Sequence, residues 1–250
     1  MSNFKTDYFK AEDYSKFRPK YPAKLFELLN SLTYKHERAW DCACGNGQAA
    51  IGLVPYFNEI IATDISEDQI EHSIPHPKIK YIKASAESCG IPDKSIDLIT
   101  VATAIHWIDK KPFFAEADRI LKPGGILAVW NYTFMTTINE KIDSIIDYLN
   151  EKILGDKDYW PREAYNLFKN GYEFDFPFTK VEIPEITMEH DWTLDELVKY
   201  LHTWSGVNVY IKKNDTDPID LVYDDLRVAW GDENIKRKIR WKLLFSARRH

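Results

Sequence analysis

The chain of 250 residues carries 33 Lys and Arg against 39 Asp and Glu, with a formal net charge of −6 and 44% hydrophobic residues. This composition is typical of a globular protein with a full core, and the negative charge argues against a nucleic-acid binder that works by bulk electrostatics. No run approaches the ~20 apolar residues of a membrane span and the first residues lack the apolar core of a signal peptide, so we expect a cytoplasmic protein.

Residues 1–21 are rich in aromatic and charged side chains and show no clear periodicity. They form either a frayed arm or an arm that packs over a binding site, because Tyr and Arg bury area and still offer hydrogen-bond donors. After Pro22, apolar residues recur at helical spacing and predict an amphipathic helix that contains Leu25, Leu28, Leu29 and Leu32.

A glycine-containing turn follows the first predicted strand, which ends near Cys42. Gly45-x-Gly47-x-x-Ala50 matches the dinucleotide-binding fingerprint, in which glycines let the backbone approach a ligand closely. Asp41 precedes these glycines, where a negative charge disfavours a pyrophosphate and favours a ligand that carries a cation. Cys42-x-Cys44 lacks the spacing of a zinc site, so we expect reduced, buried cysteines and no metal centre.

The second strand is expected at residues 59–64 and ends on Asp64. An acid at this distance after the glycines suits a ribose, because one carboxylate accepts hydrogen bonds from both hydroxyls. Ser66 is expected to cap the next helix, which leaves Asp64 free for the ligand. The third strand is expected at residues 79–83.

The fourth strand is expected at residues 95–102 and is apolar nearly throughout, as a strand covered on both faces should be. Thr103 and the pair His106–Trp107 follow its carboxyl end, the edge at which open α/β sheets bind ligands. A lone His or Trp is more often part of a core, but this position favours a functional role. A helix over 112–121, a type II turn at Pro123–Gly124 and a strand over 126–130 come next.

Three motifs resemble a known family. Asp41-x-x-x-Gly45-x-Gly47 and Leu121-Lys-Pro-Gly-Gly125 resemble the class I S-adenosylmethionine-dependent methyltransferases, and Tyr14-x-x-x-Arg18-Pro-x-Tyr21-Pro22 resembles small-molecule members related to the trans-aconitate methyltransferases. The resemblance implies S-adenosylmethionine as cofactor and a Rossmann-like α/β fold. Its sheet would have seven mainly parallel strands, the last antiparallel, with helices on both faces and a helical cap inserted after the fifth strand. Ala43 stands where the family often has Gly, so we expect a negative φ there.

The resemblance also implies the residues of the site. The cofactor would contact Tyr14, Arg18, Asp41, Ala43, Gly45, Gly47, Asp64, Ile65, Ser85, Ala86, Glu87 and Thr103. The acceptor would contact Tyr21, His106, Trp107, Tyr132 and Trp204, with His106 as the candidate catalytic residue. Ser85 stands where the family commonly has an acid, so Ala86 and Glu87 are expected to share the adenine contact. Trp204 is equally consistent with core packing.

We expect one domain in four parts: an arm (1–21), a cofactor-binding core (22–132), a cap insertion (133–178), and closing helices and strands (179–250). A strand is expected at 179–184, and a capping box at Thr193–Glu196 begins a helix that ends near residue 204. Asp217-Pro218 begins another helix that continues to Trp230, and the alternation over 239–247 predicts the closing strand.

Three functions stay open. The glycine fingerprint allows an NAD(P)-dependent oxidoreductase, and Tyr148-x-x-x-Lys152 has the spacing of an acid/base pair, although such pairs often arise by chance on a helix face. A non-catalytic S-adenosylmethionine-binding protein is the second alternative. Asp41 and the Lys122–Gly125 turn favour in-line methyl transfer to a small molecule, for which a carboxylic acid acceptor needs no base. We expect neither a nucleic-acid nor a membrane partner, and a monomer or homodimer.

Overall fold

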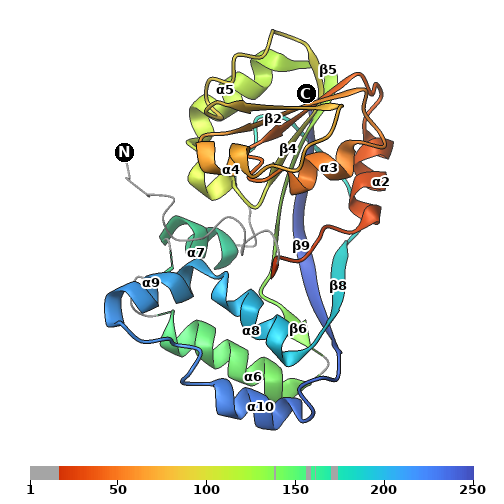
Figure 1. Ribbon diagram of the computed structural model, residues 1–250. Coiled ribbons are helices and arrows are strands. Elements are labelled where there is room, and N and C mark those ends of the chain that lie inside the picture. Colours follow the sequence, from red (N-terminus) through yellow and green to blue (C-terminus); the bar gives the residue numbers. More distant parts are fainter. Residues whose placement is uncertain (1–16, 138, 156–158, 161, 170–173) are drawn as a thin grey trace. The chain divides into compact units, whose positions relative to one another are not determined.

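The computed structural model describes residues 17–137, 139–155, 159–160, 162–169 and 174–250, and the chain forms two compact units (Figure 1). The sheet unit consists of Lys20–Thr133, Asn170–Thr187 and Lys242–His250. The helical unit consists of Met1–Pro19, Phe134–Lys169 and Met188–Trp241. The segment predicted to bind the cofactor therefore lies within the sheet unit. Among the described residues, no helix is both long and apolar enough to cross a membrane.

Five parallel strands form the centre of the sheet unit: β1 (Arg38–Cys42), β2 (Glu59–Asp64), β3 (Ile79–Lys83), β4 (Ile96–Ala102) and β5 (Leu121–Tyr132). The sheet order is β3-β2-β1-β4-β5-β9-β6, and β9 (Arg237–Arg249) is antiparallel to β5, as predicted for the closing strand. β4 is buried from Ile96 to Val101, which agrees with its apolar sequence. β5 begins earlier than predicted because Leu121 already pairs with Ile96 before the turn.

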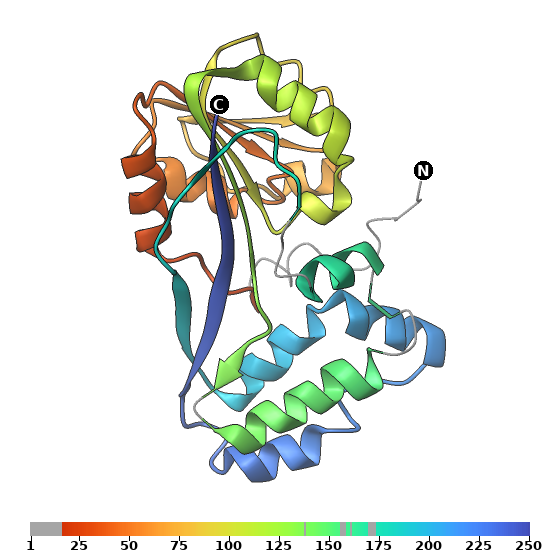
Figure 2. The same ribbon diagram turned by 180° about the vertical axis from the view of Figure 1, so that it is seen from behind.

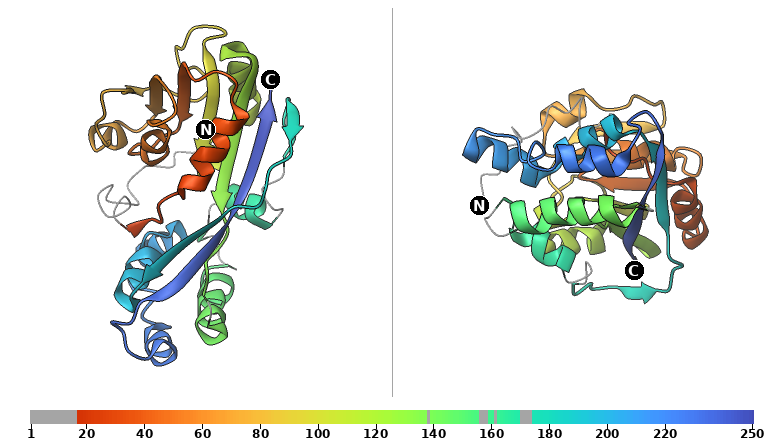
Figure 3. Two further views of the ribbon diagram at one scale, coloured as in Figure 1. Left: turned by 90° about the vertical axis from the view of Figure 1, so that its right-hand side faces the viewer. Right: turned by 90° about the horizontal axis from the view of Figure 1, so that it is seen from below.

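Within the part of the chain that the structure describes, the sheet has nine strands instead of the expected seven. The strands β6 (Thr136–Thr137), β7 (Thr179–Val181) and β8 (Thr187–Trp192) all pair with β9, and Figure 3 shows β9 running between β5 and β7. β9 has 13 residues and so offers backbone hydrogen-bonding groups to several short partners. Neither β6 nor β8 was predicted from the sequence, and β7 is shorter than the strand expected at 179–184. A strand of two residues, such as β6, leaves no alternation in the sequence.

Helices cover both faces of the parallel strands, as predicted: α2 (Ala23–Leu32), α3 (Gln48–Leu53), α4 (Glu67–Glu71) and α5 (Lys110–Ile120). The chain crosses from β1 to β3 in one direction and from β4 to β5 in the opposite direction. Right-handed crossovers therefore place α3 and α4 on one face and α5 on the other. Figure 2 shows α5 in front of the strands, with α3 behind them.

Buried charges connect the amino ends of these strands. Asp97 is 3% exposed, and its Oδ2 accepts hydrogen bonds from the backbone amides of Glu37 and Arg38 at 3.0 and 2.9 Å. Lys122 lies 2.8 Å from Asp97 Oδ1 and also pairs with Glu37. Gly124 follows with φ +78°, as the predicted type II turn requires. These contacts hold β1, β4 and β5 in register at the end opposite to the predicted site.

The helical unit contains α6 (Glu140–Tyr148), the π-helical turn η2 (Leu149–Ile153), α7 (Arg162–Lys169), α8 (Leu194–His202), α9 (Ser205–Asn214) and α10 (Tyr223–Trp230). The predicted capping box is confirmed, because Thr193 Oγ1 accepts from the Glu196 amide and the Glu196 carboxylate accepts from the Thr193 amide. The last helix begins at Tyr223 instead of Asp217. The Asp217 carboxylate accepts from the Ile219 amide at 2.9 Å, which forms a turn before the helix.

Candidate functional site

The strand order reverses between β1 and β4, and most of the predicted site residues of the sheet unit follow the carboxyl ends of its strands. In open α/β sheets, ligands bind outside the carboxyl ends of the strands at such a reversal, because the loops diverge there and leave space. The register pairs Cys42 with Val101, so the turns after β1 and β4 begin side by side.

The turn after β1 contains two glycines with positive φ, Gly45 at +54° and Gly47 at +88°. Gly47 is the N-cap of α3, so the first amides of that helix face the end of the strand. A Cβ atom on Gly47 would lie 2.0 Å from the hydroxyl oxygen of Tyr81, which shows that this side chain covers the turn from β3. A side chain at this position would therefore require Tyr81 to move and would strain the backbone.

The expectation of a negative φ at Ala43 is wrong, because Ala43 has φ +53°. Thr103, just after β4, has φ +57°. Both turns are held by hydrogen bonds to a neighbouring strand, from the Cys44 amide to the Thr63 carbonyl at 2.9 Å and from the Thr103 amide to the Trp130 carbonyl at 2.8 Å. A non-glycine residue in this region costs about 1 to 3 kcal/mol, and such strain is concentrated at functional sites.

Asp41 is fully buried on β1 and only one of its carboxylate oxygens has a partner. Its Oδ1 accepts from the hydroxyl of Thr100 on β4 at 2.7 Å, while its Oδ2 is buried without a hydrogen-bond partner among the described residues. Burial raises the pKa of Asp41 to about 7, although the Thr100 hydroxyl and the backbone amide of Ala50 lower it in part. A buried carboxylate oxygen without a partner is unfavourable, and a cation or donor on a ligand would remove the cost.

Asp64, at the end of β2, was expected to be free for the ligand, but its carboxylate already accepts two hydrogen bonds. Its Oδ2 accepts from the Gly45 amide at 2.8 Å and its Oδ1 from the Ser66 amide at 2.9 Å, so the carboxylate connects the glycine turn to the start of α4. Ser66 caps α4 as predicted, because its hydroxyl accepts from the Gln69 amide. The adjacent Ile65 is 70% exposed, which leaves its side chain accessible to a ligand.

Ser85, Ala86 and Glu87 follow β3, where Ser85 and Ser88 form an isolated bridge. Ala86 is 9% exposed. The Glu87 carboxylate accepts from the backbone amide of Asp109 at 3.2 Å, which ties this loop to the start of α5. The loop therefore has a defined position beside the end of β4.

His106 and Trp107 lie in the 3-10 turn η1 (Ile105–Trp107), with ring centroids 4.7 Å apart. The Trp107 side chain is among the exposed apolar residues, at 50%. Tyr21 also reaches this region, because its hydroxyl lies 3.0 Å from Thr103 Oγ1. Tyr132, at the end of β5, is 6% exposed and mostly covered by its neighbours.

Three predicted site residues are not found in the sheet unit: two lie in the helical unit, and the third is not among the described residues. Arg18 and Trp204 lie in the helical unit, where Arg18 Nη2 donates to the Thr203 carbonyl at 2.9 Å. Trp204 is 3% exposed and packs edge-on against Phe134 and Tyr200. Tyr14 lies outside the described residues. The predicted contacts of all three stay predictions.

Sequence reasoning missed two residues that shape the site, Thr100 and Tyr81. Thr100 is the partner of Asp41, and the signal in the sequence was a hydroxyl within the apolar run from Leu98 to Ala102. Tyr81 gives no such signal, because its contact with the glycine turn connects residues far apart in the chain. All three cysteines are free and buried, and burial raises the pKa of the Cys42 and Cys44 thiols, so neither supplies a thiolate.

Comparisons with known proteins identify relatives of this chain. A family profile described as a methyltransferase domain matches residues 40–129. A putative methyltransferase of Dictyostelium discoideum is 28% identical over 88% of this chain and 84% of its own length. The probable S-adenosylmethionine-dependent methyltransferase CRG1 of Saccharomyces cerevisiae is 25% identical over 95% and 94% of the two chains. The structure of a putative type II methyltransferase from Anaeromyxobacter dehalogenans has a TM-score of 0.86 and 34% identity, covering 93% of this chain and 98% of that chain.

Proposed function

The chain belongs to the class I S-adenosylmethionine-dependent methyltransferases, and we propose that it transfers the methyl group to a small carboxylic acid at the carboxyl ends of β1 and β4. The observation that carries the cofactor assignment is the buried Oδ2 of Asp41, which has no partner among the described residues. A turn made for a pyrophosphate would gain nothing from this charge, whereas an ammonium group would complete its hydrogen bonding. The oxidoreductase alternative is not favoured by the comparisons.

The residues at the glycine turn fit this cofactor. Asp41 would hold the ammonium group of the methionine part, and the backbone at Gly45, which carries no side chain, would allow close approach. Asp64 would accept from the ribose hydroxyls. Its two oxygens already accept one backbone amide each, but a carboxylate has about four lone-pair sites, so it can accept further hydrogen bonds. When bound, the cofactor supplies an electrophilic methyl group on a sulfonium.

The acceptor assignment rests on the donors near the end of β4. His106, the indole N–H of Trp107 and the hydroxyl pair Tyr21–Thr103 belong to the same end of the sheet unit. A carboxylate requires hydrogen-bond donors to hold it. Its oxygen lone pair can attack the methyl carbon without prior loss of a proton. The protein then has only to align this oxygen with the methyl group and to exclude water.

We also propose that the chain is one of the small-molecule methyltransferases related to the trans-aconitate methyltransferases. The support is the segment Tyr14-x-x-x-Arg18-Pro-x-Tyr21-Pro22, whose Arg18 is a candidate charge partner for a carboxylate. Within the sheet unit, Tyr132 is proposed as an apolar wall beside the acceptor.

The proposal is tested by methyl transfer from radiolabelled S-adenosylmethionine to carboxylic acids, phenols and amines that share one carbon skeleton. We expect turnover on carboxylic acids. Turnover restricted to phenols or amines would contradict the acceptor assignment and leave the cofactor assignment intact. Tight binding of NADH, with no calorimetric response to S-adenosylhomocysteine, would contradict the cofactor assignment itself.

A further inference from the structure

The loop between β3 and β4 is tied to α5 at three successive places. Glu87 accepts from the amide of Asp109, the N-cap of α5, at 3.2 Å. Cys89 donates to Glu116 Oε1 from its amide at 2.9 Å and from its thiol at 3.1 Å. The carbonyl of Ile91 accepts from Arg119 Nη2 at 2.8 Å. The loop that carries the proposed adenine contacts is thus held by one helix along most of its length.

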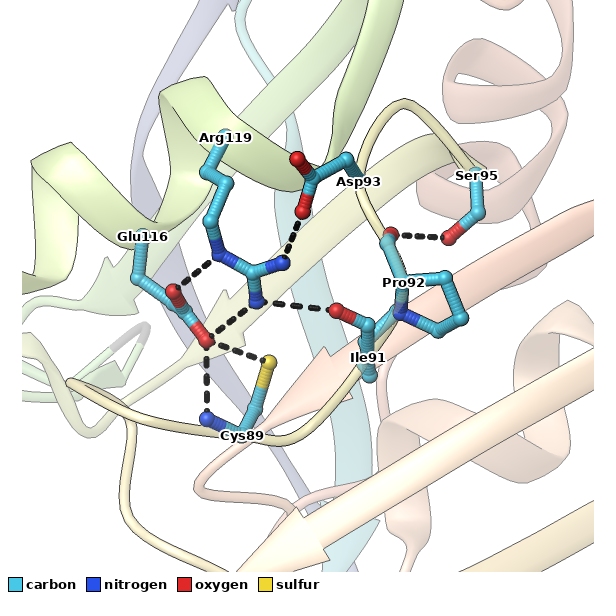
Figure 4. A network of polar contacts seen from close by, with 7 residues as sticks. All are labelled: Cys89, Ile91, Pro92, Asp93, Ser95, Glu116 and Arg119. Atoms are coloured by element: carbon cyan, nitrogen blue, oxygen red, sulfur yellow. Dashed lines mark hydrogen bonds and ion pairs between the residues drawn. The ribbon is translucent and has the colours of Figure 1, made fainter.

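Glu116 and Arg119 form the centre of this network (Figure 4). Arg119 donates to both oxygens of Glu116 at 2.8 Å and pairs with Asp93 through Nη1. Glu116 is 9% exposed, and the Arg119 guanidinium lowers the pKa of this carboxyl to about 2, so Glu116 stays ionised as an acceptor for Cys89. Hydrogen bonds to an ionised and largely buried carboxylate are roughly twice as strong as neutral ones.

The start of α5 carries a second part of the proposed site. The turn η1 with His106 and Trp107 ends two residues before Asp109, and Asp109 caps the helix by accepting from the Lys111 amide. The adenine loop and the His106–Trp107 turn are therefore attached to the same rigid element. A helix that fixes both segments sets the position of one relative to the other.

We infer that Glu116 and Arg119 are positioning residues for the adenine of the cofactor, acting through the hydrogen bonds that hold Cys89 and Ile91. This inference rests on the proposed function, together with the expectation from the sequence that the adenine contacts Ala86 and Glu87. An ion pair with a structural role alone would lower thermal stability and leave ligand affinity of the folded protein unchanged. A positioning role predicts a loss of affinity for every ligand that contains adenine.

The test compares two ligands by calorimetry at a temperature at which each variant is folded. S-adenosylhomocysteine contains adenine, ribose and the amino-acid part, whereas 5′-methylthioadenosine lacks the amino-acid part. Glu116→Gln should weaken both ligands by about tenfold, so that the ratio of their Kd values stays as in the wild type. The control is Glu59→Gln, which breaks a more exposed Glu–Arg pair of 2.7 Å between Glu59 and Arg38 at the opposite end of the strands and should leave both Kd values unchanged.

Arg119→Lys provides a second variant if Glu116→Gln does not fold, because it keeps a cation beside Glu116 and loses the planar group that reaches Ile91. It should weaken both ligands by a smaller and equal factor. Wild-type affinity for both ligands in a folded variant with a lowered Tm would overturn the inference, as would a loss confined to S-adenosylhomocysteine. A wild-type protein that binds neither ligand would refute the proposed function, which separates that failure from the failure of this inference.

Discussion

Replacing Asp41 by Asn keeps the shape of the side chain and removes its charge. The pKa of Asp41 is raised by burial from the ordinary 3.8 to about 7, so the folded state holds this proton more tightly than the unfolded state does. At about 1.4 kcal/mol for each pKa unit, the ionised carboxylate reduces the free energy of unfolding by roughly 4 kcal/mol once the pH exceeds both values.

Because the pKa of Asp41 is raised on folding, its contribution to stability has a distinctive pH dependence. Between the unfolded pKa of 3.8 and the folded pKa of about 7, the unfolded state binds fewer protons, so the contribution of Asp41 makes stability fall as the pH rises and then level off. Asp41→Asn removes this contribution. The amide leaves a buried N–H without a partner at a cost of about 1 to 3 kcal/mol, but this cost does not vary with pH. The free energy of unfolding of the variant relative to the wild type should therefore increase by roughly 4 kcal/mol from pH 4 to pH 8.

Urea denaturation at several pH values measures this difference, with the exposed Asp220→Asn as a control for the change in net charge. Calorimetry with S-adenosylhomocysteine measures how the affinity for the ligand depends on pH. Because an ammonium group stabilises the ionised form of Asp41, wild-type affinity should rise from pH 6 to pH 8 with release of a proton near pH 6, and Asp41→Asn should bind more weakly without this slope. 5′-Methylthioadenosine, which has no ammonium group, should not show the slope with either protein.

Two results would refute this reasoning. A constant difference in unfolding free energy across the pH range would mean that Asp41 does not titrate with the raised pKa. If the wild type and Asp41→Asn bound S-adenosylhomocysteine with the same affinity and the same pH dependence, Asp41 would not contact the ammonium group of the ligand.

Three further predictions concern neighbouring residues. Asp64→Ala should weaken S-adenosylmethionine binding by about 1.5 to 3 kcal/mol, since ribose acceptors are lost, and unchanged affinity by calorimetry would remove Asp64 from the site. Gly47→Ala should lower both Tm and cofactor affinity, because its Cβ would lie 2.0 Å from Tyr81 Oη at φ +88°, and adding Tyr81→Phe should restore part of the loss; no restoration would argue against this clash. His106→Gln should keep much of the activity on a carboxylic acid with a flat profile from pH 6 to 9, whereas a loss of about 100-fold would identify His106 as a general base.

Several features of this protein were accessible from sequence because they depend on neighbours along the chain. β2 and β3 have the predicted bounds, and the capping box at Thr193 and the N-cap at Ser66 are confirmed. Side-chain alternation, capping and turn chemistry act over a few residues, so they are visible without knowledge of the fold. The acid before the glycines and the family motifs were sufficient to indicate the class of cofactor.

Other features arise only from contacts between distant segments. The short strands β6 and β7 exist because β9 offers them partners, and Ala43 adopts a positive φ while the amide of Cys44 is bound to Thr63 on another strand. The same holds for Asp41, whose raised pKa comes from the surroundings that remove water and not from its own sequence context. Local patterns along the chain were enough to predict which residues stand at the ends of several strands. Whether their atoms are strained, desolvated or already bonded depends on what lies across the sheet, so these properties required the fold.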